Sequence, residues 1–110
     1  MTTSDSSKLV LYEGREVKRS IQLSGTTPIV IGRNADCDCV IADRRVSKHH
    51  ARVRWNGVSY ELEDLGSKNG TFINGKRVRS PMLLADGDEI QIAYCVRIQF
   101  QLEPLKPAVL

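Results

Sequence analysis

The sequence predicts an all-β fold, a sandwich of about ten to eleven short, mostly antiparallel strands. Short runs of alternating apolar and polar residues recur along the 110 residues, and a period of two is typical of half-buried strands. Turn residues separate these runs, and no stretch keeps the 3.6-residue period of an amphipathic helix over three turns. A chain of 110 residues has room for one domain with a single core.

The clearest strands are expected at residues 51–55 and 95–102. Within 51–55, three apolar residues (Ala51, Val53 and Trp55) alternate with two arginines, as in a strand with one face in the core and one in solvent. Residues 95–102 alternate in the same way. In chain order, the other strands are expected at 9–12, 17–23, 28–32, 59–65, 71–73, 82–84 and 89–92.

Turn chemistry between these runs supports the assignment. Two asparagine-glycine pairs, at 56–57 and 74–75, and an Asp-Gly-Asp run at 86–88 provide residues that tolerate positive φ. About ten short strands joined by such turns fit a sandwich. We expect a domain over residues 8–103, a flexible N-terminal tail over 1–7, and a C-terminal tail or linker over 104–110.

Composition excludes several classes of protein. Hydrophobic residues make up 41% and charged residues 26% of the chain, values typical of a globular protein. The sequence contains neither an apolar run of the roughly 18 residues that cross a bilayer nor a secretory signal pattern. The three cysteines (Cys37, Cys39 and Cys95) are an odd number without a repeated CxxC unit, which argues against a disulfide framework or a four-cysteine zinc site. A cytoplasmic protein with reduced thiols is expected.

The net charge of +3 is concentrated in one segment. Residues 33–54 carry six cations and three anions, a surplus of 6 − 3 = +3, while the other ten cations and ten anions cancel. Such a surplus indicates either an anionic partner or a solvated face of mixed charge.

The run VSKHHARV at 46–53 brings a serine, a lysine and two histidines together. A serine hydrolase needs a histidine base oriented by a third group, and no strand-turn-helix elbow surrounds Ser47. A metal site could use Cys37, Cys39, His49 and His50, but their spacing matches no common zinc pattern. No metal or other cofactor is therefore expected. The two histidines can also be read structurally, one in solvent and one hydrogen-bonded beneath the loop.

Binding a phosphate requires neither a nucleophile nor a metal ion. A phosphate is held by an arginine fork, by hydroxyl and amide donors, and by lysine as a point charge. Three separate loops provide these donors in the motifs GR (32–33), SK (47–48) and SKNGT (67–71). Each motif is weak alone, and their order and spacing carry the signal.

The segments IGRNADCDCVIADRRVSKHHARV, ELEDLGSKNGTFINGKRV and LLADGDEIQI together resemble the forkhead-associated (FHA) domain, a phosphothreonine-binding β-sandwich. The resemblance covers residues 29–92. It implies that Arg33 and Ser47 bind the phosphate, and that Asn69 hydrogen-bonds the peptide main chain. His50 would be structural and would brace the loop that holds Ser47. Gly32, Gly70 and Thr71 would shape the loops, and Asn74 and Gly75 would close a hairpin.

Several positions depart from the family pattern or extend it. Lys48 stands where the family often has arginine or another polar residue, and Lys68 where many members have threonine or serine, so both are expected to be auxiliary phosphate contacts. Ala93 stands where glycine is frequent. Arg44 and Arg45 precede Ser47, so we expect them to contact the peptide and to select an acidic residue C-terminal to the phosphothreonine.

The predicted function is therefore a phosphothreonine-dependent binding module in Ser/Thr kinase signalling, without catalysis. Its expected partner is a phosphothreonine-containing protein, with no nucleic acid and no membrane, and the isolated domain is expected to be monomeric. The alternative is an FHA-like module that docks a protein or nucleic acid through the same basic loops without reading phosphate.

Overall fold

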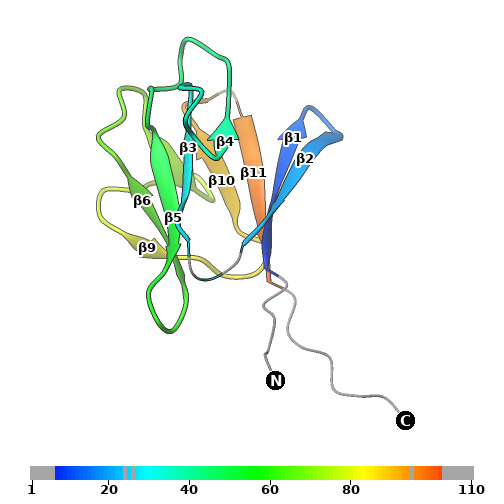
Figure 1. Ribbon diagram of the computed structural model, residues 1–110, viewed down its shortest axis with the longest axis vertical. Coiled ribbons are helices and arrows are strands. Elements are labelled where there is room, and N and C mark those ends of the chain that lie inside the picture. Colours follow the sequence, from blue (N-terminus) through cyan, green and yellow to red (C-terminus); the bar gives the residue numbers. More distant parts are fainter. Residues whose placement is uncertain (1–6, 24, 26, 95, 103–110) are drawn as a thin grey trace.

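Two β-sheets packed face to face make up the protein, as a computed structural model shows (Figure 1). The structure describes residues 7–23, 25, 27–94 and 96–102. In chain order the strands are β1 (Lys8–Glu13), β2 (Glu16–Gln22), β3 (Ile29–Gly32), β4 (Cys39–Val40), β5 (Ala51–Trp55), β6 (Tyr60–Asp64), β7 (Thr71–Ile73), β8 (Lys76–Arg77), β9 (Met82–Leu83), β10 (Glu89–Ile92) and β11 (Val96–Gln101).

The strand order is β2-β1-β11-β10-β7-β8 in the larger sheet and β4-β3-β5-β6-β9 in the smaller one. All neighbouring strands pair antiparallel except β3 and β4, which run parallel. The predicted all-β sandwich of short, mostly antiparallel strands is confirmed.

Most strands lie within two residues of the expected ranges, and β5 spans the expected residues, Ala51–Trp55. The strands expected from the sequence do not include β4 and β8, which have only two residues each. A two-residue strand is too short to show an alternating pattern, so its pairing depends on its neighbours in the sheet.

The expected tails lie outside the described residues, apart from Ser7. Ser7 is fully buried, and its carbonyl accepts a hydrogen bond from the N–H of Leu23 at 2.9 Å. Cys95, expected at the start of the last strand, also lies outside them. No helix long and apolar enough to cross a membrane occurs in the part of the chain that the structure describes.

Alternate side chains of both sheets fill the core. Ile90, Ile98 and Phe100 from the larger sheet meet Val53 and Leu62 from the smaller one, and each is at most 1% exposed. Burying an aliphatic or aromatic side chain of this size contributes about 1.5–3 kcal/mol. This core fixes the strand ends from which the loops project.

Among the described residues, two turns place a residue other than glycine in the left-handed conformation. Asn74 (φ 49°) and Gly75 (φ 86°) join β7 to β8, as asparagine-glycine hairpins commonly do. Asn74 also accepts a hydrogen bond from the N–H of Glu89 at 2.9 Å. Ala93 has a φ of 56°, so the turn after β10 keeps the conformation that glycine favours although a methyl group is present.

Three loops gather at one end of the sandwich, the upper end in Figure 1. They are the segments 33–38 after β3, 41–50 before β5, and 65–70 between β6 and β7. Strand β1 begins and β11 ends at the opposite end (Figure 1). The motifs that the sequence analysis singled out for phosphate binding therefore meet in space.

Candidate functional site

The first component of the site is the close packing of Gly32 against loop 41–50. A Cβ atom added at Gly32 would lie only 2.2 Å from the carbonyl oxygen of Lys48 and 2.9 Å from the Sγ of Cys37. No side chain tolerates such contacts, so glycine is required here for close approach. The two loops that carry Arg33 and Ser47 are thereby held together.

Arg33 is anchored through its backbone and through one side-chain nitrogen. Its N–H donates to the carbonyl of Ser47 at 3.0 Å, and its Nε donates to the carbonyl of Val46 at 3.0 Å. The residue is exposed, and its two terminal guanidinium nitrogens have no recorded hydrogen bond within the described ranges. A fork of donors is therefore pre-oriented and open to a ligand.

Ser47 is partly buried and linked to both neighbouring segments. Its backbone N–H donates to Nδ1 of His50 at 3.0 Å, and its Oγ accepts a hydrogen bond from the N–H of Lys68 at 3.0 Å. A hydroxyl that already accepts a bond still has one O–H to donate. Ser47 can therefore donate that proton to an oxyanion.

His50 is fully buried beneath this loop. Its Nδ1 must act as an acceptor, because the Ser47 backbone N–H can only donate. The proton consequently lies on Nε2, which donates to the carbonyl of Gly70 at 2.7 Å. A neutral imidazole thus connects loop 41–50 with loop 65–70, the structural position that the family resemblance implies for His50.

Loop 65–70 is built around Asp64, which the sequence analysis did not single out. Its carboxylate accepts hydrogen bonds from the hydroxyls of Ser67 and Thr71, both at 2.6 Å, and from the N–H groups of Gly66 and Ser67. Burial alone would raise the pKa of Asp64, but the hydrogen bonds from Ser67 and Thr71 outweigh it and hold this pKa below its usual value. An aspartate followed three residues later by serine is a local signal for such a turn.

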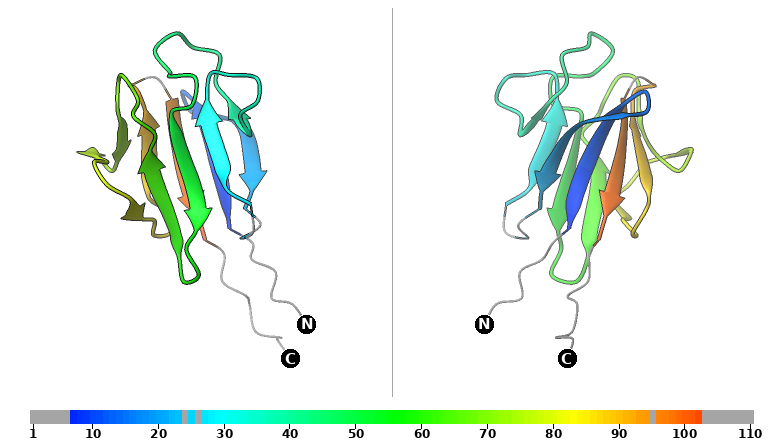
Figure 2. Two further views of the ribbon diagram at one scale, coloured as in Figure 1. Left: turned by 60° about the vertical axis from the view of Figure 1, so that its left-hand side comes forward. Right: turned by 90° about the vertical axis from the view of Figure 1, so that its right-hand side faces the viewer.

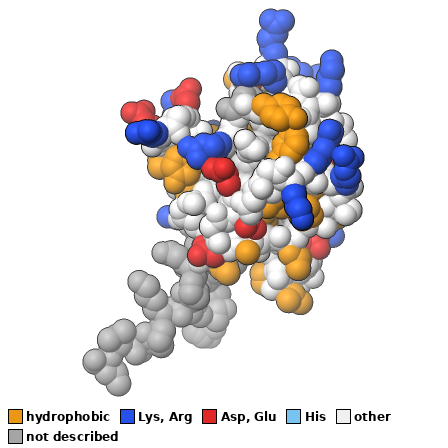
Figure 3. All heavy atoms as spheres, turned by 180° about the vertical axis from the view of Figure 1, so that it is seen from behind, with side chains coloured by type: hydrophobic (Ala, Val, Ile, Leu, Met, Phe, Trp, Pro, Cys, Tyr) orange, Lys and Arg blue, Asp and Glu red, His pale blue; other side chains and the backbone are white. Residues whose placement is uncertain are grey.

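The other expected ligand contacts lie around the same opening. Asn69 donates from Nδ2 to the carbonyl of Arg45 at 2.8 Å, which joins loop 65–70 to loop 41–50. Lys48 and Lys68 are both exposed, and neither ammonium forms a recorded ion pair with a described residue. On the back of the molecule, Lys and Arg side chains also gather towards this end (Figure 3).

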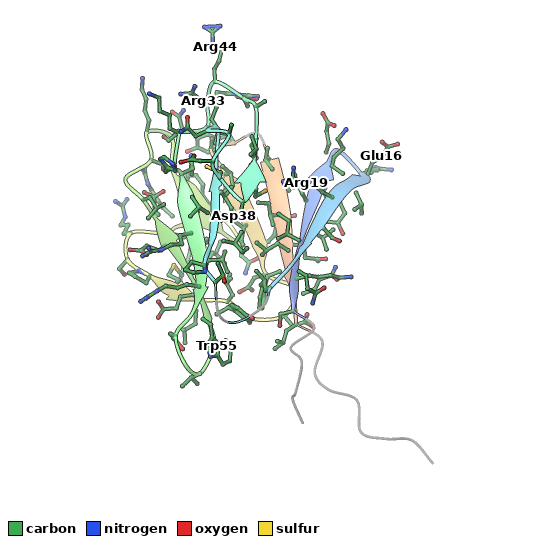
Figure 4. All side chains as sticks on the ribbon, viewed as in Figure 1. Glu16, Arg19, Arg33, Asp38, Arg44 and Trp55 are labelled. Carbon is green, nitrogen blue, oxygen red and sulfur yellow. The ribbon has the colours of Figure 1, made fainter. Side chains whose placement is uncertain are left out.

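The two arginines before Ser47 differ from each other. Arg45 Nε and Nη2 contact the two carboxylate oxygens of Asp43 at 3.0 and 2.8 Å, so this edge of its fork is already occupied. Arg44 is exposed and points away from the domain at the tip of the loop (Figure 4). Arg45 therefore has a partner within its own loop, and the expected contact of both arginines with an acidic residue of the peptide stays a prediction.

The geometry does not assemble a nucleophile and its base. The imidazole of His50 accepts the backbone N–H of Ser47 and does not contact its hydroxyl, and its other nitrogen faces a carbonyl rather than a carboxylate. A serine nucleophile needs the opposite arrangement, with the base on the hydroxyl and an acid orienting the base.

The cysteine and histidine residues that could bind a metal are divided between different environments. Both ring nitrogens of His50 form hydrogen bonds within the protein. His49 is exposed, and its Nε2 lies 3.0 Å from the carboxylate of Asp36. Donor atoms of Asp36, Cys37 and His49 lie within 4.8 Å of one another. Cys37, however, donates to the carbonyl of Lys48 at 3.2 Å. Burial raises the pKa of this thiol, which disfavours the thiolate that a metal requires.

Comparison with known proteins identifies one family. Residues 29–93 match the FHA domain family. The oxoglutarate dehydrogenase inhibitor of Corynebacterium jeikeium is 46% identical over 61 residues, which cover 56% of this chain and 42% of that protein. The glycogen accumulation regulator GarA of Mycolicibacterium smegmatis is 38% identical over 89 residues, which cover 81% of this chain and 55% of GarA. The chain therefore spans only about half the length of these curated relatives.

Solved structures show the same fold. One, from work on phosphothreonine-dependent FHA domain interactions, is 36% identical with a TM-score of 0.80, and the match covers 94% of this chain and 100% of that one. Another is EmbR of Mycobacterium tuberculosis in complex with a low-affinity phosphopeptide. It is 30% identical with a TM-score of 0.79, and the match covers 96% of this chain and 26% of EmbR.

Proposed function

This chain belongs to the FHA domain family, and we propose that it binds phosphothreonine in a partner protein without catalysing a reaction. The observation that carries the proposal is the convergence of Arg33 and Ser47. The guanidinium of Arg33 is held by the carbonyl of Val46 and presents its terminal nitrogens to solvent, while Ser47 keeps one O–H to donate. These donors belong to adjacent segments joined by the Arg33 N–H to Ser47 carbonyl bond.

In the proposed complex, Arg33 and Ser47 bind the phosphate directly. Lys48 and Lys68, both exposed at the same opening, add positive charge around it. Asn69 uses one amide N–H on Arg45, so its second N–H and its oxygen can contact the peptide main chain.

The strength of binding follows from these contacts. Hydrogen bonds to a charged group contribute about 1.5–3 kcal/mol each, and ordering a flexible peptide offsets part of that gain. The expected Kd is on the order of micromolar.

Two of the matched structures support phosphothreonine as the ligand. One comes from work on phosphothreonine-dependent FHA interactions, and the other holds a phosphopeptide. The proposed partner is therefore a substrate of a Ser/Thr kinase. We also propose a cytoplasmic location, since Cys37 and Cys39 are free thiols and reduced thiols are typical of that compartment.

The experiment is a calorimetric titration of the 110-residue chain with three matched peptides that contain threonine, phosphoserine or phosphothreonine at one position. We expect measurable binding of the phosphothreonine peptide alone. Arg33→Ala should weaken it about 30-fold or more, because the dianion loses its bidentate partner. Arg79→Ala removes another exposed arginine, outside the site, and should change the affinity less than twofold.

Equal affinity for the threonine and phosphothreonine peptides would support the alternative, a docking module that does not read phosphate. Equal affinity of Arg33→Ala and the parent protein for the phosphothreonine peptide would contradict the assigned site.

A further inference from the structure

A groove of about 530 Å³ opens beside the phosphate-binding loops, between the edges of the two sheets. Strand β2 is the last strand of one sheet and β4 the last strand of the other, and both lie on the same side of the sandwich (Figure 2). The volume falls within the range of about 300–1,000 Å³ typical of ligand sites.

The groove stays open because neither edge covers the other. Strand β4 has only two residues, and it pairs with Ile31 and Gly32 of β3, so this edge of the smaller sheet is short. A long hydrogen bond of 3.4 Å, from Nη2 of Arg19 to the carbonyl of Asp38, crosses the gap between these edges.

The floor of the groove is apolar. Leu11 and Val96 line it and are only partly buried, although both pack against the core. Ile41, 7% exposed, and Val40 and Ala42 complete the apolar wall. Covering partly exposed aliphatic surface is favourable, so the floor suits an aliphatic side chain.

The rim carries a surplus of positive charge. Two of its cations are already paired, Lys18 with Glu13 at 3.0 Å and Arg45 with Asp43 at 2.8 Å. Arg19 has no carboxylate partner within the described ranges, and its hydrogen bond to Asp38 is at the limit of length. An acidic ligand residue next to the aliphatic one would pair with Arg19.

The groove is continuous with the proposed phosphate site through Arg45. This residue lines the groove, and its carbonyl accepts the amide of Asn69. Ser47 follows two residues later, a separation of at most about 7 Å along an extended backbone. A peptide held at Ser47 therefore passes close to the groove entrance.

We propose that this groove binds an aliphatic side chain, adjacent to an acidic one, in the segment of the phosphoprotein that flanks the phosphothreonine. The inference rests on the proposed function and adds a second recognition element to it. Burial of one aliphatic side chain, reduced by the ordering of the flanking segment, should tighten binding about five- to tenfold.

The test uses two kinds of phosphothreonine peptide in an anisotropy assay. A short one carries three alanines on each side, and long ones of 17 residues carry a Leu-Glu pair placed at successive positions on either side in an alanine-serine background. We expect one narrow window of positions at which the long peptide binds about five- to tenfold more tightly. Replacing Leu-Glu by Leu-Gln should reduce that gain about twofold, and Arg19→Ala should remove this difference.

Ala42→Trp fills the groove entrance from an exposed position. It should abolish the gain from Leu-Glu while leaving the short peptide's affinity unchanged, which also shows that the variant is folded. Ala85→Trp, at an exposed alanine outside the groove, is the matched control and should keep the gain.

The absence of any favoured window, or a gain that survives Ala42→Trp, would overturn the groove proposal while phosphate-dependent binding of the short peptide leaves the proposed function standing. If the parent protein binds the short peptide no better than its unphosphorylated form, the proposed function fails and the groove proposal fails with it.

Discussion

His50 and Ser47 are joined by a hydrogen bond in which the serine backbone N–H donates to the histidine Nδ1 at 3.0 Å. The serine hydroxyl takes no part in this bond and accepts the N–H of Lys68 instead. The histidine therefore fixes the backbone that presents the hydroxyl, and the two residues should respond differently to substitution.

His50→Ala should reduce the free energy of unfolding by at least about 2 kcal/mol. The substitution leaves the Ser47 N–H and the Gly70 carbonyl without their partner, and an unpaired buried polar group costs about 1–3 kcal/mol. Urea denaturation measures the change. His49→Ala, at an exposed neighbour, is the control and should stay within about 0.5 kcal/mol of the parent. Equal stability of the two variants would show that His50 does not brace the loops.

Ser47→Ala should weaken phosphopeptide binding about tenfold or more, because one hydrogen bond to a charged group is lost. The free energy of unfolding should fall by about 0.5–1.5 kcal/mol as well, because Ser47 Oγ accepts the Lys68 N–H. Calorimetric titration and thermal denaturation separate the two effects, with the exposed Ser80→Ala as control. Unchanged affinity would exclude a direct contact with phosphate.

Asp64 should make the stability depend on pH in the acid range. Its pKa is held below the usual value in the folded protein, with hydrogen bonds from Ser67 and Thr71 outweighing burial. Since the folded pKa is lower than the unfolded one, the stabilisation is fully present above the unfolded pKa of about 3.9. It is lost as the pH falls through the folded pKa.

Asp64→Asn should therefore lower stability at neutral pH by about 2 kcal/mol, as hydrogen bonds to a charged acceptor are weakened. It should also flatten the fall in stability below about pH 4. Urea denaturation between pH 2.5 and 7 would show both effects, with Glu16→Gln at an exposed position as the control. A variant with the same acid dependence as the parent would contradict this role for Asp64.

Arg44 should select an acidic residue C-terminal to the phosphothreonine more strongly than Arg45, because Asp43 already occupies one edge of the Arg45 fork. Arg44→Ala should reduce that selection about two- to fivefold, the range of an exposed ion pair. Asp43→Asn should increase it by releasing Arg45. A phosphopeptide array read at low and high salt measures the selection position by position.

Local pairing and diffuse attraction give different results in that array. Selection at one position that Arg44→Ala removes indicates a local contact. A weak acidic bias at all positions, which disappears in high salt, indicates long-range attraction screened over about 8–10 Å. Such a uniform bias would show that neither arginine forms a specific pair with the peptide.

The sequence by itself determined the class of fold and the positions of most strands. Alternation with a period of two is a local property, because adjacent side chains of a strand point to opposite faces. The β5 segment Ala51–Trp55 shows this pattern within five residues. The order and spacing of the motifs around Arg33, Ser47 and Asn69 also sufficed to indicate the FHA family, which the match over residues 29–93 confirms.

Only the tertiary structure decided which neighbouring residues took which role. His49 and His50 are adjacent, yet one faces solvent and the other is fully buried. Arg44 and Arg45 are both exposed but differ in their contacts, because Arg45 pairs with Asp43. The partners that fix the site are distant in sequence: His50 reaches Gly70 across 20 positions and Asn69 reaches Arg45 across 24. Such contacts depend on the fold that brings the loops together, so no local pattern encodes them.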